Sequence, residues 1–339
     1  MKKSKGDKQP NIVAKQLVDK EVVLPSPSVT LIFGAGASHG SGGCSKTPPL
    51  GKDLFNDLNE GGGAFLPLLN KSGGAFSQLK DDIKSVFLND GFEAGMAMIA
   101  NDNREIIPLQ RELALFFSSF QAKNDNAYVR LFSRLRAYTK QLNIVTLNYD
   151  LLIEQALISH QLDFNYHGNG NGINLLKLHG SSNFLPRFPT WLNINNLVAK
   201  KTSVFFEGLE TDFVFTHEEV TSWHYDNNNI KLSPIIAMYE KGKRVVINNE
   251  LINEIQLNYS RIMKMSSSVI LVGIRYTADD VHVWKPIQES NADLFIVNTN
   301  PSDTLAWAKK YNFRNISVLE NSFDKVVWDI IKIVRSYYL

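Results

Sequence analysis

The chain has 339 residues, of which 44% are hydrophobic, so it can bury a large core as one big domain with insertions or as two domains. Lys and Arg total 36 against 34 for Asp and Glu, and this near balance argues against a general nucleic-acid or membrane-surface binder. Its one cysteine, Cys44, excludes an internal disulfide and a multi-cysteine zinc site, and a single free thiol is typical of a reducing cytosol.

Residues 1–26 are rich in lysine and contain no long apolar segment, which predicts a basic flexible leader rather than a signal peptide. Along the whole sequence, no run approaches the roughly 18 apolar residues that a membrane span needs. We therefore expect a cytoplasmic protein whose folded domain covers residues 27–339.

Short apolar runs that end in glycine or polar residues recur along this domain and predict buried parallel strands. They lie at residues 28–33, 143–147, 175–178, 268–273 and 294–298. Between them, residues 51–140 carry apolar side chains at helical spacing and predict a helical insertion, while the aromatic-rich residues 186–245 predict a small mixed subdomain. Strands that alternate with helices describe an α/β fold with a Rossmann-like, doubly wound parallel sheet.

Polar clusters follow four of the strands, at residues 34–38, 146–150, 179–182 and 273–280. Ligands of doubly wound sheets bind outside the carboxyl ends of the strands. We therefore expect the four clusters to converge on one crevice.

The first cluster, Gly34-Ala35-Gly36-Ala37-Ser38, has the glycine pair that lets a backbone turn tightly and approach a diphosphate at the start of a helix. The same pattern also occurs in ordinary tight turns, and Ser38 fits either a helix cap or a cofactor contact. The Gly-Lys-Ser/Thr of a P-loop is missing. Roughly a hundred residues precede the next clear strand, whereas a dehydrogenase βαβ unit closes in about 30, so hydride transfer fits poorly.

Three ordered segments resemble the signatures of the sirtuin superfamily, namely Gly34 to Ser38, Thr146-Leu147-Asn148-Tyr149-Asp150 and Leu178-His179-Gly180. That family has a Gly-Ala-Gly-x-Ser loop, a Thr-x-Asn-x-Asp segment and a His-Gly pair in this order. The likeness continues at residues 272–280 and 296–298, so that it spans about residues 28–300.

Departures from the deacylase sirtuins indicate a different branch of the superfamily. Those enzymes carry a zinc module built from cysteines, a Pro-Asp-Phe-Arg segment and a Gln before the Asn. Here the corresponding chain reads Thr47-Pro48-Pro49-Leu50-Gly51, and Leu147 stands in place of the Gln. The sequence resembles instead the bacterial sirtuin-like proteins of antiphage defence, which hydrolyse NAD and commonly work as oligomers or with a partner protein.

The resemblance implies that NAD is the substrate, that no zinc is bound, and that Asn148, His179 and Asp150 are catalytic. It implies cofactor contacts at Gly34, Ala35, Gly36, Ser38, Thr146, Asn148, Gly180, Gly273, Thr277 and Asn298. It further implies a homo-oligomer or a separate regulatory partner such as an ATPase.

Chemically, cleavage of the nicotinamide–ribose bond passes through an oxocarbenium-like state, as in glycoside hydrolysis. The Asn148 amide can hold a water or a ribose hydroxyl, and the His179 imidazole can accept a proton. Asp150 could orient these groups or cap the next helix, and we weigh capping slightly ahead. Thr277 and Asp279 fit a cofactor pocket or an ordinary loop turn equally well.

The other histidines show no metal-ligand spacing, so we assign them to surface or core and expect no metal site. They are His39, His160, His167, His217, His224 and His282. The sequence thus predicts hydrolysis of NAD to nicotinamide and ADP-ribose, in a regulated NAD-depleting effector. Two alternatives stay open: an NAD-dependent protein deacylase or ADP-ribosyltransferase, and a non-catalytic NAD sensor or scaffold.

Overall fold

A parallel sheet of seven strands, in the order β3-β4-β2-β1-β7-β8-β9, is the centre of the computed structural model, which describes residues 28–60, 74–99, 103–168, 172–190, 206–237 and 247–338. The expected leader at residues 1–26 and parts of the expected subdomain at 186–245 lie outside these ranges. The strands are β1 (Ser28–Phe33), β2 (Leu142–Thr146), β3 (Phe164–Asn165), β4 (Ile173–Lys177), β7 (Ser266–Val272), β8 (Asp293–Val297) and β9 (Ile316–Leu319).

Every neighbouring pair in this sheet runs parallel, and the central strand β1 pairs with β2 on one side and β7 on the other. From Val29 to Phe33 the residues of β1 are fully buried, as a strand covered on both faces must be. The predicted α/β fold with a doubly wound parallel sheet is confirmed.

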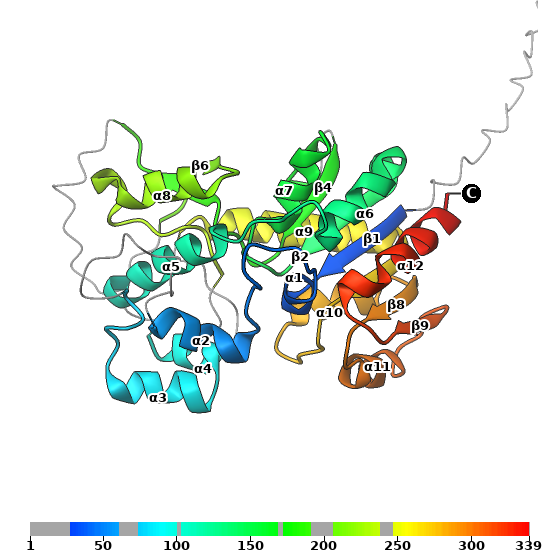
Figure 1. Cartoon of the computed structure of the whole chain (residues 1–339), viewed down its shortest axis with the longest axis horizontal. Coiled ribbons are helices and arrows are strands. Elements are labelled where there is room, and N and C mark those ends of the chain that lie inside the picture. The colour runs from blue at the N-terminus through cyan, green and yellow to red at the C-terminus, as the bar shows by residue number, and fades with distance from the viewer. Residues whose placement is uncertain are drawn as a thin grey trace, which may run out of the picture.

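Helices cover both faces of the sheet (Figure 1). On one face α6 (Ala127–Leu135) contacts both α7 (Leu152–Ser159) and α12 (Phe323–Ser336). Helix α9 (Asn249–Met265) contacts β1, β4 and α10 (Val281–Gln288). Because crossovers between parallel strands are right-handed, and the chain reverses direction across the sheet after β4, α9 and α10 lie on the opposite face from α6 and α7. The short helices α1 (Ala35–His39) and α11 (Ser302–Ala308) follow β1 and β8.

The region before α6 is helical in its described parts and lies beside the sheet, at the lower left of Figure 1. It comprises α2 (Gly51–Asn59), α3 (Asp81–Asn89), α4 (Phe92–Ile99) and α5 (Asn103–Ser118). Its core is a group of aromatic rings in which Phe55 stacks on Phe87 with centroids 4.5 Å apart and Phe76 contacts both. After α6, the 3-10 helix η2 (Arg136–Gln141) leads directly into β2.

A two-stranded antiparallel sheet, β5 (Phe184–Arg187) with β6 (Glu210–Phe213), precedes α8 (His217–Tyr225) and the 3-10 helix η4 (Asn227–Asn229). Helix α8 packs on α5, where the buried Arg111 guanidinium donates to the carbonyls of His224, Asn229 and Leu232. Burial lowers the pKa of Arg111 to about 10.

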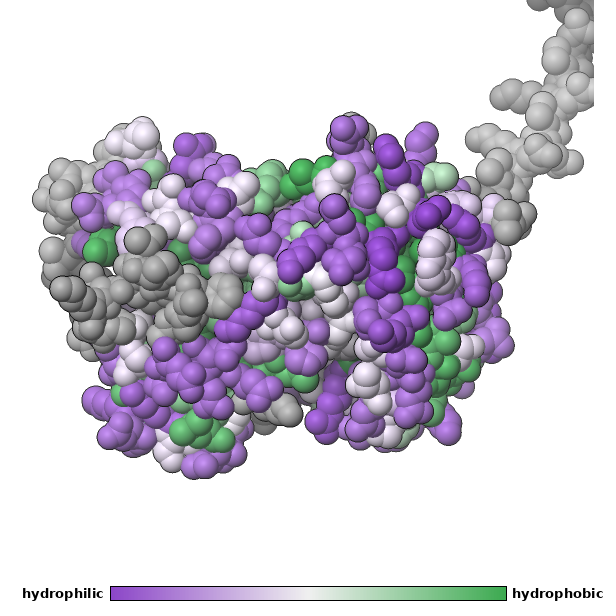
Figure 2. Space-filling model, in the orientation of Figure 1, coloured by the Kyte–Doolittle hydropathy of each residue, from purple (hydrophilic) through white to green (hydrophobic). Residues whose placement is uncertain are grey.

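Hydrophilic side chains cover most of the molecular face that Figure 2 shows, with small hydrophobic patches between them. Among the helices of the described ranges, none is both long and apolar enough to cross a membrane.

Candidate functional site

The loops after β1 and β7 pack directly against each other, and this contact accounts for their glycines. Gly34 N–H donates to Val272 O and Gly36 N–H donates to Gly273 O, both at 3.0 Å. A Cβ on Gly36 would lie 2.8 Å from the Gly273 carbonyl oxygen. Gly273 has φ +62°, and a Cβ there would lie 2.0 Å from Ala37 N. The packing of the two loops therefore requires these glycines, whether or not a diphosphate also lies against them.

Asn148 joins the end of β2 to the β1 loop. Its Nδ2 donates to Gly34 O at 3.0 Å and to Ser38 Oγ at 2.9 Å. A backbone carbonyl can only accept, so the contact with Gly34 fixes which end of the amide is Nδ2. The acceptor Oδ1 is thereby the atom that remains for a ligand hydroxyl or a water.

Ser38 and Thr146 belong to the same buried connection. Ser38 lies inside α1 rather than at its cap, and its hydroxyl is 3.1 Å from the Tyr128 hydroxyl. The Thr146 hydroxyl donates to Phe33 O at 3.2 Å and accepts from Asn148 N at 3.1 Å. These bonds hold the ends of β1 and β2 in one arrangement.

A small pocket of about 110 Å³ opens beside this connection. Its lining includes the exposed Ala35, the half-buried Leu147 and the buried polar residues Ser38, Asn148 and Asp150. Its other lining residues are mostly apolar and come largely from the helical region before α6: Pro48, Pro49, Gly51, Leu54, Phe92, Glu93, Phe117 and Tyr149. The pocket thus has apolar walls and a polar end at Asn148.

Asp150 is buried and serves the start of α7, where its Oδ1 accepts from Leu152 N at 3.1 Å. Burial raises the pKa of the Asp150 carboxyl, although Lys177 nearby and a hydrogen bond from Ser38 act in the opposite direction. This carboxyl supports the start of α7 and also lines the pocket. Its position therefore agrees both with a helix-capping role and with a role in orienting groups of the site.

A fully buried ion pair lies next to Asp150. Lys177 Nζ donates to Glu154 Oε1 at 2.7 Å, and both side chains are 0% exposed. The same ammonium donates to the backbone oxygen of Asp150 at 2.7 Å, and the Tyr166 hydroxyl donates to Glu154 Oε1 at 3.1 Å. The ion pair therefore fixes the end of β4 against the end of β2.

His179 follows β4 and is held by the chain segment at residues 235–237. Ala237 N–H donates to His179 O at 2.8 Å, and Ser181 N–H donates to Ile235 O at 3.0 Å. Gly180 between them has φ +73°, and a Cβ on it would lie 2.0 Å from Ile235 O. The His179 side chain is only 2% exposed.

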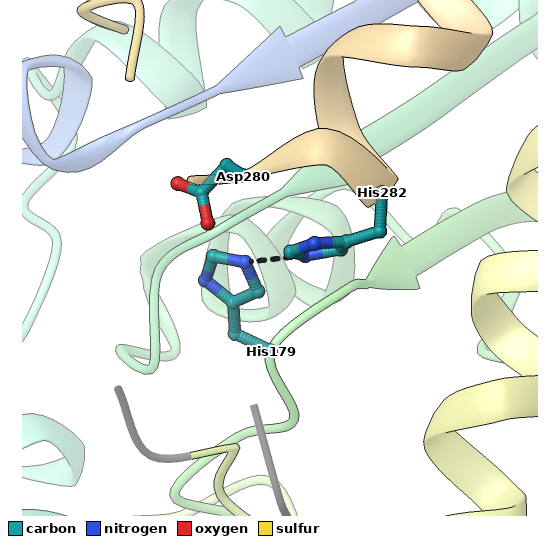
Figure 3. Close-up of side chains that lie close together, drawn as sticks. All are labelled: His179, Asp280 and His282. Carbon is teal, nitrogen blue, oxygen red and sulfur yellow. Dashed lines mark hydrogen bonds between the residues drawn. The ribbon is translucent and has the colours of Figure 1, made fainter. Parts of the chain in front are cut away.

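The His179 imidazole faces helix α10. Its Nε2 lies 3.0 Å from Nε2 of His282, in the first turn of α10, and the carboxylate of Asp280 points toward the two rings (Figure 3). Sequence reasoning did not group His282 with His179, because 103 positions separate them and only the fold brings α10 to the end of β4. The Asp-x-His pair of Asp280 and His282, which begins at the last residue of the fourth polar cluster, was the one sequence signal that could have pointed to it.

The remaining predicted cofactor contacts lie at the ends of β7 and β8. The Thr277 hydroxyl donates to Asp280 Oδ2 at 2.9 Å. Asn298 Nδ2 donates to Ile274 O at 3.0 Å, and Asn298 Oδ1 accepts from Asn300 N at 3.1 Å. Asn298 thus joins the β8 end to the β7 loop.

All four predicted clusters stand at the same edge of the sheet, but their side chains form two groups. One group surrounds Asn148, with Ser38, Thr146 and Asp150. The other surrounds His179, with Asp280 and His282. The Asn148 amide donates to Gly34 O and Ser38 Oγ, whereas the His179 imidazole faces His282.

No protein-family model matches the chain, and no curated protein matches it. Among solved structures, it is similar to a Sir2 homologue in complex with NAD, at 16% identity over 91% of this chain and 89% of that one, with a TM-score of 0.44. It is also similar to two variants of a Sir2 homologue in complex with ADP-ribose, at 13% identity over 91% of this chain and 92% of theirs, with TM-scores of 0.44 and 0.43. At these values, the site itself has to carry any functional conclusion.

Proposed function

We propose that the protein binds NAD at this edge of the sheet and hydrolyses it to nicotinamide and ADP-ribose. The observation that carries the proposal is the Asn148 carboxamide, which is fixed by Gly34 and Ser38 and stands at the polar end of a small apolar pocket. The resemblance of residues 34–38, 146–150 and 178–180 to sirtuin signatures supports NAD as the ligand.

The pocket beside Asn148 suits the nicotinamide ring. Its volume of about 110 Å³ is below the roughly 150 Å³ of an engineered apolar cavity that holds benzene, so the pocket has to widen when the ring enters. Apolar walls such as Phe117 and Leu147 would contact the ring faces, and the polar end would meet the carboxamide or the ribose. A ring seated there would place the bond to be cleaved next to Asn148.

Asn148 and His179 would then divide the chemistry. The Asn148 Oδ1 would hold a ribose hydroxyl or the attacking water as positive charge develops at the anomeric carbon. The His179 imidazole would accept a proton from that water or hydroxyl. Because His179 is 2% exposed, substrate entry has to open a path to it. Asp150 would position the neighbouring groups.

The rest of NAD would follow the sheet edge. The diphosphate would lie at the exposed Ala35 and the adjoining turn of Gly34 and Gly36, and the adenosine at Asn298 on the end of β8. Gly180, Gly273 and Thr277 would complete the cofactor contacts. This path crosses from β1 to β8 by way of β7, and those strands are direct neighbours.

A hydrolase that consumes NAD needs restraint, and we propose that the protein is a regulated NAD-depleting effector of antiphage defence in the cytoplasm. The support is the resemblance to bacterial sirtuin-like defence proteins. Control would come from assembly into a homo-oligomer or from a partner such as an ATPase. Light scattering on the purified protein tests this, since a monodisperse monomer that is fully active alone contradicts it.

NAD turnover by site variants tests the proposed chemistry. Asn148→Ala and His179→Ala should each lower the rate of nicotinamide release at least about 100-fold, the usual effect of losing a catalytic acid–base or charge-stabilising group. Matched controls are Asn165→Ala and His160→Ala, which replace half-buried side chains outside both side-chain groups of the site and should keep the rate. Full-rate cleavage by the two site variants overturns the mechanism.

The same assay separates the other two functions. Nicotinamide release that requires an acyl-lysine peptide would indicate a deacylase, and transfer to a protein acceptor would indicate an ADP-ribosyltransferase. Saturable NAD binding without turnover, with and without co-purifying partners, would indicate a sensor or scaffold.

A further inference from the structure

We propose that His179, Asp280 and His282 form a binding site for a divalent first-row transition-metal ion, and that the bound ion blocks the chemistry of His179. The metal-binding part stands on the side-chain geometry alone, and the blocking part rests on the proposed function.

The three side chains lie close together, so that small side-chain rotations would bring all of them to one ion (Figure 3). Their ligand atoms all lie within 4.8 Å of one another, and the two Nε2 atoms are 3.0 Å apart. Two nitrogens at this separation, each about 2.1 Å from a shared ion, subtend an angle of about 90° at that ion. This is the angle between adjacent ligands of an octahedral or five-coordinate centre, which leaves further positions for water.

Asp280 is oriented for this cluster by its neighbours. It occupies the N-cap position of α10, where an aspartate ordinarily accepts a backbone N–H of the first turn, yet its side chain makes no capping bond. Instead Oδ2 accepts from the Thr277 hydroxyl at 2.9 Å, and the carboxylate points toward His179 (Figure 3). A hydroxyl that fixes a ligating carboxylate is the usual outer support of a metal site.

The donor set selects the kind of cation. Two imidazole nitrogens suit zinc, copper, iron, cobalt or nickel, whereas magnesium and calcium prefer oxygen donors throughout. Two histidines and one carboxylate, with open positions, are the set that non-haem iron and catalytic zinc sites use. The carboxylate also offsets part of the charge of a divalent ion beside the nearly buried His179.

An ion can reach the cluster from solvent. Half-buried His282 lines a hollow of about 790 Å³ between α9 and α10, whose rim includes Asp279, Gln256 and Lys285. Gln256 also donates to Leu178 O at 3.0 Å, so the hollow adjoins the end of β4 that carries His179. At this entrance Asp279 adds a negative carboxylate and Lys285 a positive ammonium group.

Binding of the ion would compete with catalysis. A metal on the Nε2 atom of His179 takes the electron pair that would otherwise accept a proton from water or ribose. We therefore infer that zinc or cobalt inhibits NAD cleavage by this protein, and that removing the ion restores it.

Metal binding is measured first, without NAD, on full-length protein treated with chelator and dialysed. Equilibrium dialysis against cobalt(II), with the bound metal measured by atomic emission, should give one equivalent per chain, which zinc(II) then displaces. His282→Gln and Asp280→Asn should each weaken cobalt binding at least tenfold, and Thr277→Val about tenfold through loss of the outer hydrogen bond. The matched control His160→Gln, whose side chain binds Val129 O outside the cluster, should keep the affinity.

Cobalt binding well below one equivalent, or equal affinities in all these proteins, overturns the site. Near-ultraviolet circular dichroism shows whether each variant is folded, and Thr277→Val, which keeps all three ligands, tests the geometry if a ligand variant unfolds.

Zinc inhibition of NAD cleavage is measured second. His282→Gln should need at least tenfold more zinc than the unaltered protein for half-inhibition, and equal requirements overturn the blocking role. The two proposals fail differently. Protein that binds cobalt but never cleaves NAD disproves the hydrolase, whereas protein that cleaves NAD but binds no cobalt disproves the metal site.

Discussion

The buried ion pair between Lys177 and Glu154 gives a sharp test of how the site is held together. Lys177→Met keeps an apolar stem of similar length but removes the ammonium that donates to Glu154 Oε1 and Asp150 O, both at 2.7 Å. Since both charged side chains are 0% exposed, the variant leaves in the core a carboxylate whose remaining hydrogen bond among the described residues comes from the Tyr166 hydroxyl. Removing one partner of a buried pair costs about 3–5 kcal/mol, and we expect a loss in this range.

The assay is urea unfolding at fixed pH, followed by far-ultraviolet circular dichroism, with the slope compared between variants. The double variant Lys177→Met with Glu154→Gln removes the uncompensated charge but keeps an acceptor for Tyr166, so it should regain at least about 2 kcal/mol over the single variant. A single-variant loss below about 1 kcal/mol, or a double variant no more stable than the single one, would refute the reasoning.

Two further predictions concern stability. Burial raises the pKa of Glu112 from 4.5 to about 7, so its contribution to stability is full below pH 4.5 and is lost as the pH rises through 7. Glu112→Gln should therefore be more stable than the unaltered protein at pH 8.5 by up to about 3 kcal/mol, with little gain at pH 4.5; equal urea midpoints at pH 8.5 would contradict this. Gly273→Ala should cost about 2 kcal/mol or more, because the new Cβ meets Ala37 N at 2.0 Å. Gly208→Ala, at φ +71° with nothing within 4 Å of the Cβ, should cost about 1 kcal/mol in the same unfolding assay, and equal losses at the two glycines would count against the loop packing.

Most of the sheet could be predicted because its longer, buried strands are recognisable from their own residues. Residues 28–33 and 268–272 are β-branched or apolar runs that stop at glycine, as strands buried on both faces do. Strand β3 has only two residues, and the residues of β9 are only partly buried or exposed, so neither has a run long enough to stand out. Length and burial of each strand decided which ones were predictable.

The sequence could predict individual residues of the site, but not which of them meet in the fold. Asn148 and His179 could be singled out because each follows a strand with polar neighbours, and parallel strands end at one edge. The meeting of His179 with His282 depends on where α10 lies after β7, which no local pattern specifies. The packing of Gly273 against the β1 loop is likewise a contact between distant segments that no local pattern specifies.

NAD turnover with identification of the products tests the central claim most directly. Purified full-length protein, freed of metal and assayed with and without co-purifying partners, should release nicotinamide and ADP-ribose in equal amounts without any acceptor. Asn148→Ala should abolish this release while binding variants such as Asn298→Ala mainly raise the NAD concentration required. NAD that stays intact under every condition, or full-rate release by Asn148→Ala, would contradict the account.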